Sequence, residues 1–235
     1  MRTTLLFLTT VFAPISLAAE AKPDAAPVDL PLICDFTEAE GFKPDGSAAA
    51  LKARGWHTNA AAQKDGAFEV KKPNKWSDGD LYLTDNDEKE APQAWLLLPQ
   101  IPAGHVALHL STDGLQNQTA TVSLATGETA QAKITLENNT HAVLAAGDKE
   151  EKFESTDVKW FRKPVDVRLA WETQKSGDIA YTVTLTMPGQ TPVVLRGTTR
   201  KLPDRLVLGV GFGTAVNRTL VVEDLAVTED KTQDK

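Results

Sequence analysis

The sequence has 235 residues, of which 41% are hydrophobic, 24% charged and 6% aromatic. This composition is typical of globular proteins and excludes the collagen-like, intrinsically disordered and disulfide-dense classes. The net charge is −7, from 25 Lys and Arg against 32 Asp and Glu. Because binding to a phosphate backbone needs an excess of basic residues, we do not expect nucleic acid as a partner.

The first 18 residues predict a signal peptide. Arg2 supplies a positive start, the run from Leu5 to Leu17 is largely apolar, and Ser16 and Ala18 place small residues at −3 and −1 of a cleavage point. The apolar run is too short to span a bilayer, and we expect no membrane span in the rest of the sequence. The chain is therefore expected to be secreted or periplasmic, including a surface-associated form.

The remaining residues divide into three parts by composition. Residues 19–30 are rich in Ala and Pro with few large apolar groups, which predicts a flexible lead-in. Residues 31–228 are expected to form one folded domain. Residues 229–235 are entirely polar, which predicts a disordered tail.

One short helix is predicted near the start of the domain. Ser47 is a good N-cap, the residues from Ala48 to Arg54 favour a helix, and Gly55 follows at the C′ position. Each of these signals has a local physical cause, since the N-cap accepts a free backbone N–H and glycine tolerates the left-handed conformation. No other segment predicts a helix.

After Trp56 the apolar residues recur with a period of two, which predicts half-buried strands. Turn-forming residues separate the alternating runs. The charged residues 147–152 predict a loop ahead of a short strand at Phe153. Many short strands at this spacing predict an all-β fold, a sandwich of two antiparallel sheets. The clearest alternating segments are 119–124, 131–136, 165–171 and 181–187.

Four segments together resemble a concanavalin A-like jelly roll, in particular its laminin-G-like branch. They are Cys34-Asp35-Phe36 with Gly41-Phe42, the run from Asp78 to Leu83, the segment from Trp160 to Trp171, and a closing strand from Leu220 to Val227. The resemblance covers residues 32–228 as an order of elements. It implies two stacked sheets, one of them concave, with the first and last strands adjacent. It also implies binding of glycans or proteins, although some members of the superfamily are glycoside hydrolases or lyases.

The same resemblance implies a structural calcium ion on the convex side of the sandwich. In this family an acidic residue early in the closing strand helps to bind that ion, and Asp224 occupies this position, with Asp35 as a second candidate ligand. The loops around residues 78–80 and 85–88 also concentrate the oxygen ligands that calcium prefers. Ordinary turn chemistry, in which Asp and Asn cap their own backbone, is the alternative explanation for these loops.

The tryptophans are the main candidates for sugar binding, since an apolar ring face stacks on a sugar while amides and carboxylates bind its hydroxyls. Trp76 lies in a polar loop, where a large ring is unexpected unless it binds a ligand. Trp95 and Trp171 lie in apolar strands and are predicted to be core residues. The candidate ligand-binding residues are Trp76, Trp56, Trp160, Asp78 and Asp80.

The sequence offers little support for catalysis. Glycoside hydrolysis needs two carboxyls roughly 5–9 Å apart, but no predicted strand carries Glu-x-Asp-x-x-Glu. His105 and His109 share a face, yet four residues of strand separate them by about 13 Å, too far for one zinc ion. No Gly-x-Ser-x-Gly elbow occurs, and Cys34, the single cysteine, lies in an apolar segment that should raise its pKa.

These observations predict an exported, non-catalytic recognition module whose ligand is a glycan of the cell envelope or its surroundings. Two alternatives remain at this point. The chain could be a glycoside hydrolase or lyase of the same superfamily, or a structural component that binds an envelope protein. The sequons at Asn117, Asn139 and Asn217 are relevant only in a host that glycosylates secreted proteins.

Overall fold

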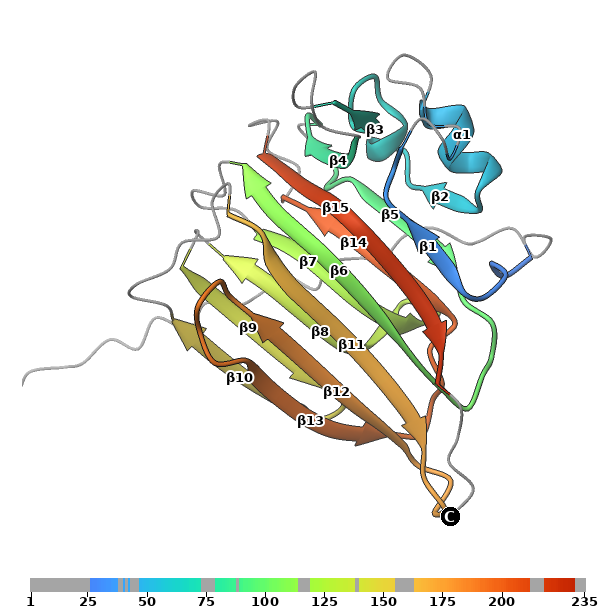
Figure 1. The fold of residues 1–235 in the computed structure, drawn as a ribbon, viewed down its shortest axis with the longest axis vertical. Coiled ribbons are helices and arrows are strands. Elements are labelled where there is room, and N and C mark those ends of the chain that lie inside the picture. Colours follow the sequence, from blue (N-terminus) through green and yellow to red (C-terminus); the bar gives the residue numbers. More distant parts are fainter. Residues whose placement is uncertain are drawn as a thin grey trace, which may run out of the picture.

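A computed structural model gives the fold of residues 26–230, with gaps at 38–39, 41, 43–46, 73–78, 88, 114–118, 138–139, 155–162 and 212–217. Two antiparallel sheets stack face to face, and a short helix lies with the first strands at one end of them (Figure 1). Within the described residues, no helix has the length and apolar character that crossing a membrane requires.

The first sheet has eight strands, seven of them in the order β13-β12-β11-β6-β15-β4-β3, while β1 pairs with β15. Its edges are therefore formed by strands that are far apart in the sequence. The strands are β1 (Leu32–Cys34), β3 (Phe68–Lys71), β4 (Asp80–Asp85), β6 (Ala103–Asp113), β11 (Val165–Thr173), β12 (Ile179–Thr186), β13 (Val193–Thr199) and β15 (Arg218–Glu229).

The second sheet has seven strands in the order β10-β9-β8-β7-β14-β5-β2. Three consecutive hairpins connect β7 to β10, whereas β14 inserts between β7 and β5 from much later in the chain. The strands are β2 (Trp56–Thr58), β5 (Gln93–Leu97), β7 (Thr119–Thr126), β8 (Thr129–Glu137), β9 (His141–Ala146), β10 (Lys149–Glu154) and β14 (Arg205–Val210).

The predicted helix is present as α1 (Ser47–Ala53). Gly55 follows it with φ +87°, a left-handed conformation that glycine adopts without steric cost and that suits the end of a helix. A single turn of 3-10 helix, η1 (Ala61–Gln63), follows β2. The described part of the chain is otherwise strand and loop, so the predicted all-β class is confirmed.

The core lies between the sheets, where alternate residues of each strand point inward. On β12 the inward residues are Ile179, Tyr181, Val183 and Leu185, all at most 4% exposed. On β8 the corresponding residues are Ala132, Ile134 and Leu136. Burial of these apolar side chains is the main driving force of folding, at roughly 25 cal/mol per Å² removed from water. The period-two pattern of the sequence thus corresponds to one inward and one outward face.

The first and last strands are adjacent, as the resemblance implies. β1 pairs with the second half of β15, from Leu32 opposite Val227 to Cys34 opposite Leu225. β4 pairs with the first half of the same edge, ending at Leu81 opposite Val222. Glu223 and Asp224 lie between these two pairings, where a β-bulge interrupts the ladder from β15 to β6.

One predicted loop is a strand. Residues 147–152 were expected to form a charged loop, but β10 begins at Lys149 and pairs with β9 as far as Glu154. Charged side chains are tolerated there because β10 is an edge strand, and edge strands commonly carry charges that prevent pairing with other molecules. The lead-in also has a defined contact, since the N–H of Val28 donates to the carbonyl of Leu97 at 2.9 Å.

Candidate functional site

The outward face of the seven-stranded sheet brings together residues that the sequence scatters over 150 positions. Cross-strand pairing places His57, Trp95, Val207, Ser123 and Lys133 side by side on β2, β5, β14, β7 and β8. We call these five residues the central row. They share a face because directly paired residues of adjacent strands point to the same side of a sheet.

A second row runs parallel to the central row, two residues further along each strand. Its members are uncharged and mostly small or hydroxyl-bearing. They are Gln93, Gly209, Thr121, Thr135 and Val143. Gly209 has a steric reason to lack a side chain, since a Cβ there would lie 2.8 Å from Oγ1 of Thr121.

Trp95 is the most unusual member of the central row. It belongs to a small apolar cluster with Ala125 and Val207, on the side of the sheet opposite the main core. Its side chain is only 6% exposed, and its buried Nε1–H has no hydrogen-bond partner within the described part of the chain. A buried donor without an acceptor costs free energy, of the order of 1–3 kcal/mol, unless a ligand or water accepts its proton.

His57 stacks against Trp95, with ring centroids 5.8 Å apart and planes inclined by 16°. Burial lowers the pKa of His57, and the positive charges of Arg205 and Lys52 lower it further. The imidazole is therefore neutral at pH 7, with one donor and one acceptor nitrogen. Arg205 is itself paired, since its Nε donates to Asp204 at 2.7 Å.

The two rows combine an aromatic and apolar end with a hydroxyl-rich centre. Ser123 and Thr135 are 6% and 8% exposed although they point away from the core. Among the described residues of the two rows there is no Asp or Glu. Hydroxyls of this face can exchange hydrogen bonds with a sugar, whereas Trp95 and Val207, at 6% and 5% exposed, present little apolar surface to it.

The structure separates the residues that the sequence singled out for ligand binding. Trp56 lies in the main core at 4% exposed and packs edge-on against Phe68, so its ring offers no face to a ligand. Asp80 lies on the outward face of the other sheet, because its neighbours Leu81 and Leu83 point into the core. Trp76, Asp78 and Trp160 lie outside the described residues.

Trp95 is buried, as the sequence predicts, but in a small hydrophobic cluster separate from the main core. Ala94, Leu96 and Leu98 point into the main core, so Trp95, which alternates with them, must point outward. The outward orientation of Trp95 could be predicted from the sequence, since alternate residues of a strand from Ala94 to Leu98 point to opposite faces. It was missed because every residue from Ala94 to Leu98 is apolar, and an apolar run does not by itself distinguish the two faces.

Acidic side chains gather on the outward face of the eight-stranded sheet, where β4 and β1 meet beside β15. The pKa of Asp80 is raised to about 6, mainly by burial and in addition by the nearby carboxylates of Glu223 and Asp224. Burial also raises the pKa of Glu223, whereas His109, 3.5 Å away, lowers it. Continuing the pairing of β1 with β15 by one residue places Asp35 opposite Asp224.

The acidic corner consists of Asp80, Glu223, Asp224 and Asp35. Calcium takes six to eight oxygen ligands, which acidic side chains and backbone carbonyls supply together. The residues that the structure describes contain no group of three Asp, Glu, His or Cys side chains suited to one metal ion. Asp35 and Asp224 are neighbours, but the remaining ligands would have to come from backbone carbonyls and water.

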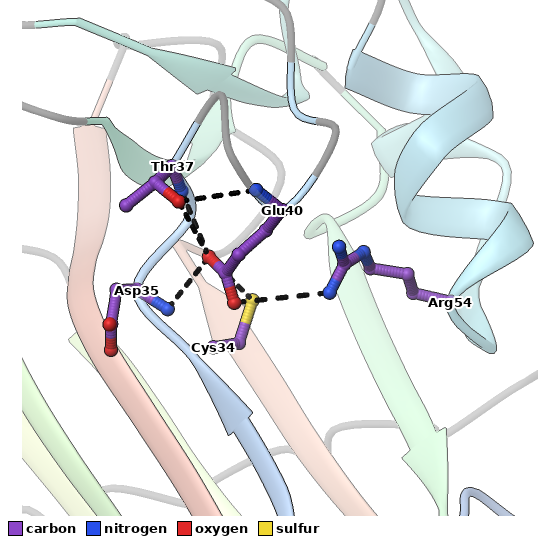
Figure 2. Close-up of polar contacts among 5 residues, drawn as sticks. All are labelled: Cys34, Asp35, Thr37, Glu40 and Arg54. Carbon is purple, nitrogen blue, oxygen red and sulfur yellow. Dashed lines mark hydrogen bonds and ion pairs between the residues drawn. The ribbon is translucent and has the colours of Figure 1, made fainter.

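The turn that follows β1 is held by a single carboxylate. Oε2 of Glu40 accepts the backbone N–H groups of Asp35 at 3.0 Å and Thr37 at 2.9 Å, and Arg54 lies 3.9 Å from Oε1 (Figure 2). The side chain of Asp35 points away from Glu40, as Figure 2 shows. Glu40 therefore fixes the backbone on which Asp35 is carried, without contacting its carboxylate.

Comparisons with known proteins identify the fold. No family model and no curated protein matches the sequence. Among solved structures, the Crh5 transglycosylase in complex with NAG is 13% identical, with a TM-score of 0.58 and coverage of 90% of this chain and 88% of that one. The exoplasmic/lumenal domain of VIP36, bound to Ca²⁺ and Man3GlcNAc, is 8% identical, with a TM-score of 0.50 and coverage of 78% and 86%.

A sialidase is 14% identical with a TM-score of 0.54, and the match covers 86% of this chain but only 18% of the sialidase. Identities this low establish a common fold and carry no residue roles across. The two stacked antiparallel sheets and the adjacent first and last strands agree with these matches. The chain has the concanavalin A-like jelly-roll fold, as its sequence resemblance predicts.

Proposed function

We propose that this protein is an exported, non-catalytic module that binds a glycan on the outward face of its seven-stranded sheet. The observation that carries the proposal is Trp95, whose buried indole N–H has no acceptor in the described part of the chain and whose row continues through Val207 to the hydroxyl of Ser123. A sugar hydroxyl or ring oxygen would accept a hydrogen bond from this N–H. Trp76, Asp78 and Trp160 are proposed as further ligand-binding residues.

The solved structures that share the fold support a carbohydrate ligand. VIP36 was solved with a mannose-containing oligosaccharide and Crh5 with NAG. Recognition is favoured over hydrolysis because the described central and second rows carry hydroxyls and one lysine, whereas hydrolysis of a glycoside needs two carboxyls across the scissile bond. The glycan would come from the cell envelope or its surroundings, and an envelope protein is the alternative partner.

Titration with a panel of neutral and acidic oligosaccharides, followed by calorimetry, tests the proposal. At least one glycan should bind the wild-type protein, and Trp95→Phe should weaken that binding about tenfold because it keeps an aromatic ring but removes the indole donor. Trp76→Ala tests the loop ring in the same way. Absence of binding across the panel, or undiminished binding by both variants, contradicts the proposal.

Trp171→Phe is the matched control. Trp171 is also a nearly buried strand tryptophan, but its Nε1 donates to the carbonyl of Ile101 at 3.1 Å inside the structure. This variant should lose stability and retain glycan affinity. Release of reducing ends from the bound glycan should not exceed the rate without protein; a catalytic rate of release would establish a hydrolase instead.

We also propose a structural calcium ion at the acidic corner, with Asp224 and Asp35 as carboxylate ligands. The support is the pKa of Asp80, which is raised first by burial and then by repulsion from Glu223 and Asp224, a repulsion that a cation would relieve. Added CaCl2 should raise the Tm of the EDTA-treated protein, and Asp224→Asn should abolish that rise, while MgCl2 at the same ionic strength has little effect. A Tm that does not respond to calcium would exclude the ion.

A further inference from the structure

Trp95 is buried although it lies on the outward face of its sheet, because its neighbours on that face cover it. Gln93 and Leu97 lie two residues away on β5, Val207 lies directly opposite on β14, and His57 lies directly opposite on β2. The first three belong to strands that are paired along both sides. Leu97 and Val207 also pack with Trp95 in one apolar cluster. These three neighbours are therefore held by the interior of the sheet.

His57 is held less firmly than the other three neighbours. β2 has three residues and ends the sheet, where it pairs with β5. Neither ring nitrogen of His57 has a hydrogen bond or ion pair among the described residues, so the contact of its ring with Trp95 is the stack, with centroids 5.8 Å apart. Rotation of this side chain toward solvent would break the stack and leave the pairing of the strands intact.

The charges around His57 do not hold its ring in place either. Burial lowers the pKa of His57, and Arg205 and Lys52 lower it further, so the ring is neutral at pH 7. Arg205 is paired with Asp204 at 2.7 Å, and Lys52 lies on α1. A neutral imidazole forms no ion pair with its surroundings, and packing alone keeps it over Trp95.

The stack and the unsatisfied indole N–H act in opposite directions. A stacked aromatic pair favours the closed position of His57 by about fivefold, equivalent to about 1 kcal/mol. A hydrogen bond from the buried N–H of Trp95 to a ligand favours the bound state by about tenfold, because that donor otherwise has no acceptor in the described part of the chain. The hydrogen bond that is gained therefore outweighs the stack that is lost.

We propose that the side chain of His57 is a gate over the indole of Trp95, closed in the free protein and rotated toward solvent when a glycan binds. This inference rests on the proposed function and adds the regulation of its site. A ring that is 6% exposed then becomes accessible from the margin of the sheet, where β2 is the last strand. The apparent affinity is reduced by the fraction of molecules in which the gate is open.

Hydrogen exchange of the indole N–H of Trp95, followed by NMR, measures the gate without any glycan. The loss of one indole signal in Trp95→Phe assigns it. His57→Ala should raise the exchange rate about fivefold, whereas His57→Phe keeps a ring in the stack and should stay within twofold of the wild type. His141→Ala is the matched control, because His141 also points outward from this sheet but lies on β9, four strands from Trp95.

The indole of Trp171 separates opening of the gate from a general loss of stability. Its N–H is bonded to the carbonyl of Ile101 at 3.1 Å in the structure, so its exchange reports wider unfolding. In His57→Ala this second signal should keep its wild-type rate. Faster exchange of both indoles would show that His57 stabilises the fold as a whole, and would overturn the gate.

Stopped-flow fluorescence with a glycan from the panel that binds the wild-type protein tests the consequence for binding. His57→Ala should bind that glycan about fivefold faster and about fivefold more tightly, because no closed state competes. Unchanged exchange and association overturn the gate while glycan binding stands. Weaker binding by His57→Ala would make His57 a contact to the glycan and also overturns the gate. If exchange responds as expected but no glycan binds, the proposed function fails and the opening of His57 serves a different ligand.

Discussion

Burial sets the chemistry of Cys34. Its side chain is 2% exposed, and burial raises the pKa of the thiol to about 11, with the nearby carboxylate of Glu40 adding to the rise. At pH 8 roughly one molecule in a thousand would then carry the reactive thiolate. The residue is therefore a buried small hydrophobe, in agreement with the sequence, and is unsuited to act as a nucleophile.

We expect Cys34 to resist labelling by iodoacetamide at pH 8 in the native protein and to react completely in 6 M guanidinium chloride. Mass spectrometry of the intact chain would measure both rates. Glu40→Gln removes a negative charge from the neighbourhood and is the informative variant, since it should leave Cys34 buried and still slow to react. Rapid labelling of the native wild type would contradict the burial of this side chain.

Asp80 should destabilise the folded protein at neutral pH. Its pKa in the folded state is about 6, against an ordinary value of 3.8, so between these values the folded state binds more protons than the unfolded state. The free energy of unfolding therefore falls as pH rises through this window and stays lower above it. The main cause is burial of the carboxyl, followed by repulsion from Glu223 and Asp224.

Replacing this carboxylate by an amide should raise the Tm at pH 7.5. We expect Asp80→Asn to gain about 1 kcal/mol after allowance for solvent screening, or roughly 2–4 °C. At pH 4 the variant and the wild type should differ little, because Asp80 is then protonated in the folded state. Calorimetry in EDTA measures the change, with Asp148→Asn in an exposed turn as control. An equal rise in Tm at both pH values would show that the charge of Asp80 does not destabilise the folded protein.

At the level of elements, the two sheets approach closely where β13 meets the end of β9. A Cβ on Gly197 would lie well inside contact distance of the carbonyl oxygen of Ala146, and one on Gly147 would meet the backbone of Thr198. Only glycine allows two backbones to come so near. This contact joins the edge of the eight-stranded sheet to the side of the seven-stranded sheet on which β10 lies.

Gly197→Ala should therefore destabilise the protein by about 1–3 kcal/mol, since the strands must separate to accept a methyl group. Val194→Ala on the same strand is the control, because its side chain is partly exposed and should change stability by less than about 0.5 kcal/mol. Urea unfolding would measure both values. Similar stability of the two variants would show that the close approach is dispensable.

The elements also show where sequence reasoning stops. Local signals predicted α1 and the strands with clean alternation, because their cause lies within a few residues. The face occupied by Trp95 and the neighbours of Lys133 depend on which strands pair, and in what register. β14 reaches its place between β7 and β5 from about 80 residues beyond β7, and no local pattern encodes that insertion.

At the scale of the whole molecule, the two sheets bury one common core, so they should unfold together. Far-ultraviolet circular dichroism reports the strands and tryptophan fluorescence reports the packed rings, among them Trp56 and Trp171. We expect the two signals to give coincident urea transitions. Two separated transitions would mean that one sheet persists without the other. The period-two pattern and the spacing of turns predicted this architecture, but not which residues meet on each outward face.

The place of β15 in the sheet has a consequence for biosynthesis. This strand, Arg218–Glu229, is the last of the described strands along the chain, but it lies in the interior of its sheet. It pairs with β6 along one side and with β4 and β1 along the other. A nascent chain that still lacks these dozen residues has no means of joining its early and middle strands into one layer. Folding of this sheet must then wait until synthesis reaches this segment, and the export that we propose would need the polypeptide to stay unfolded for that long.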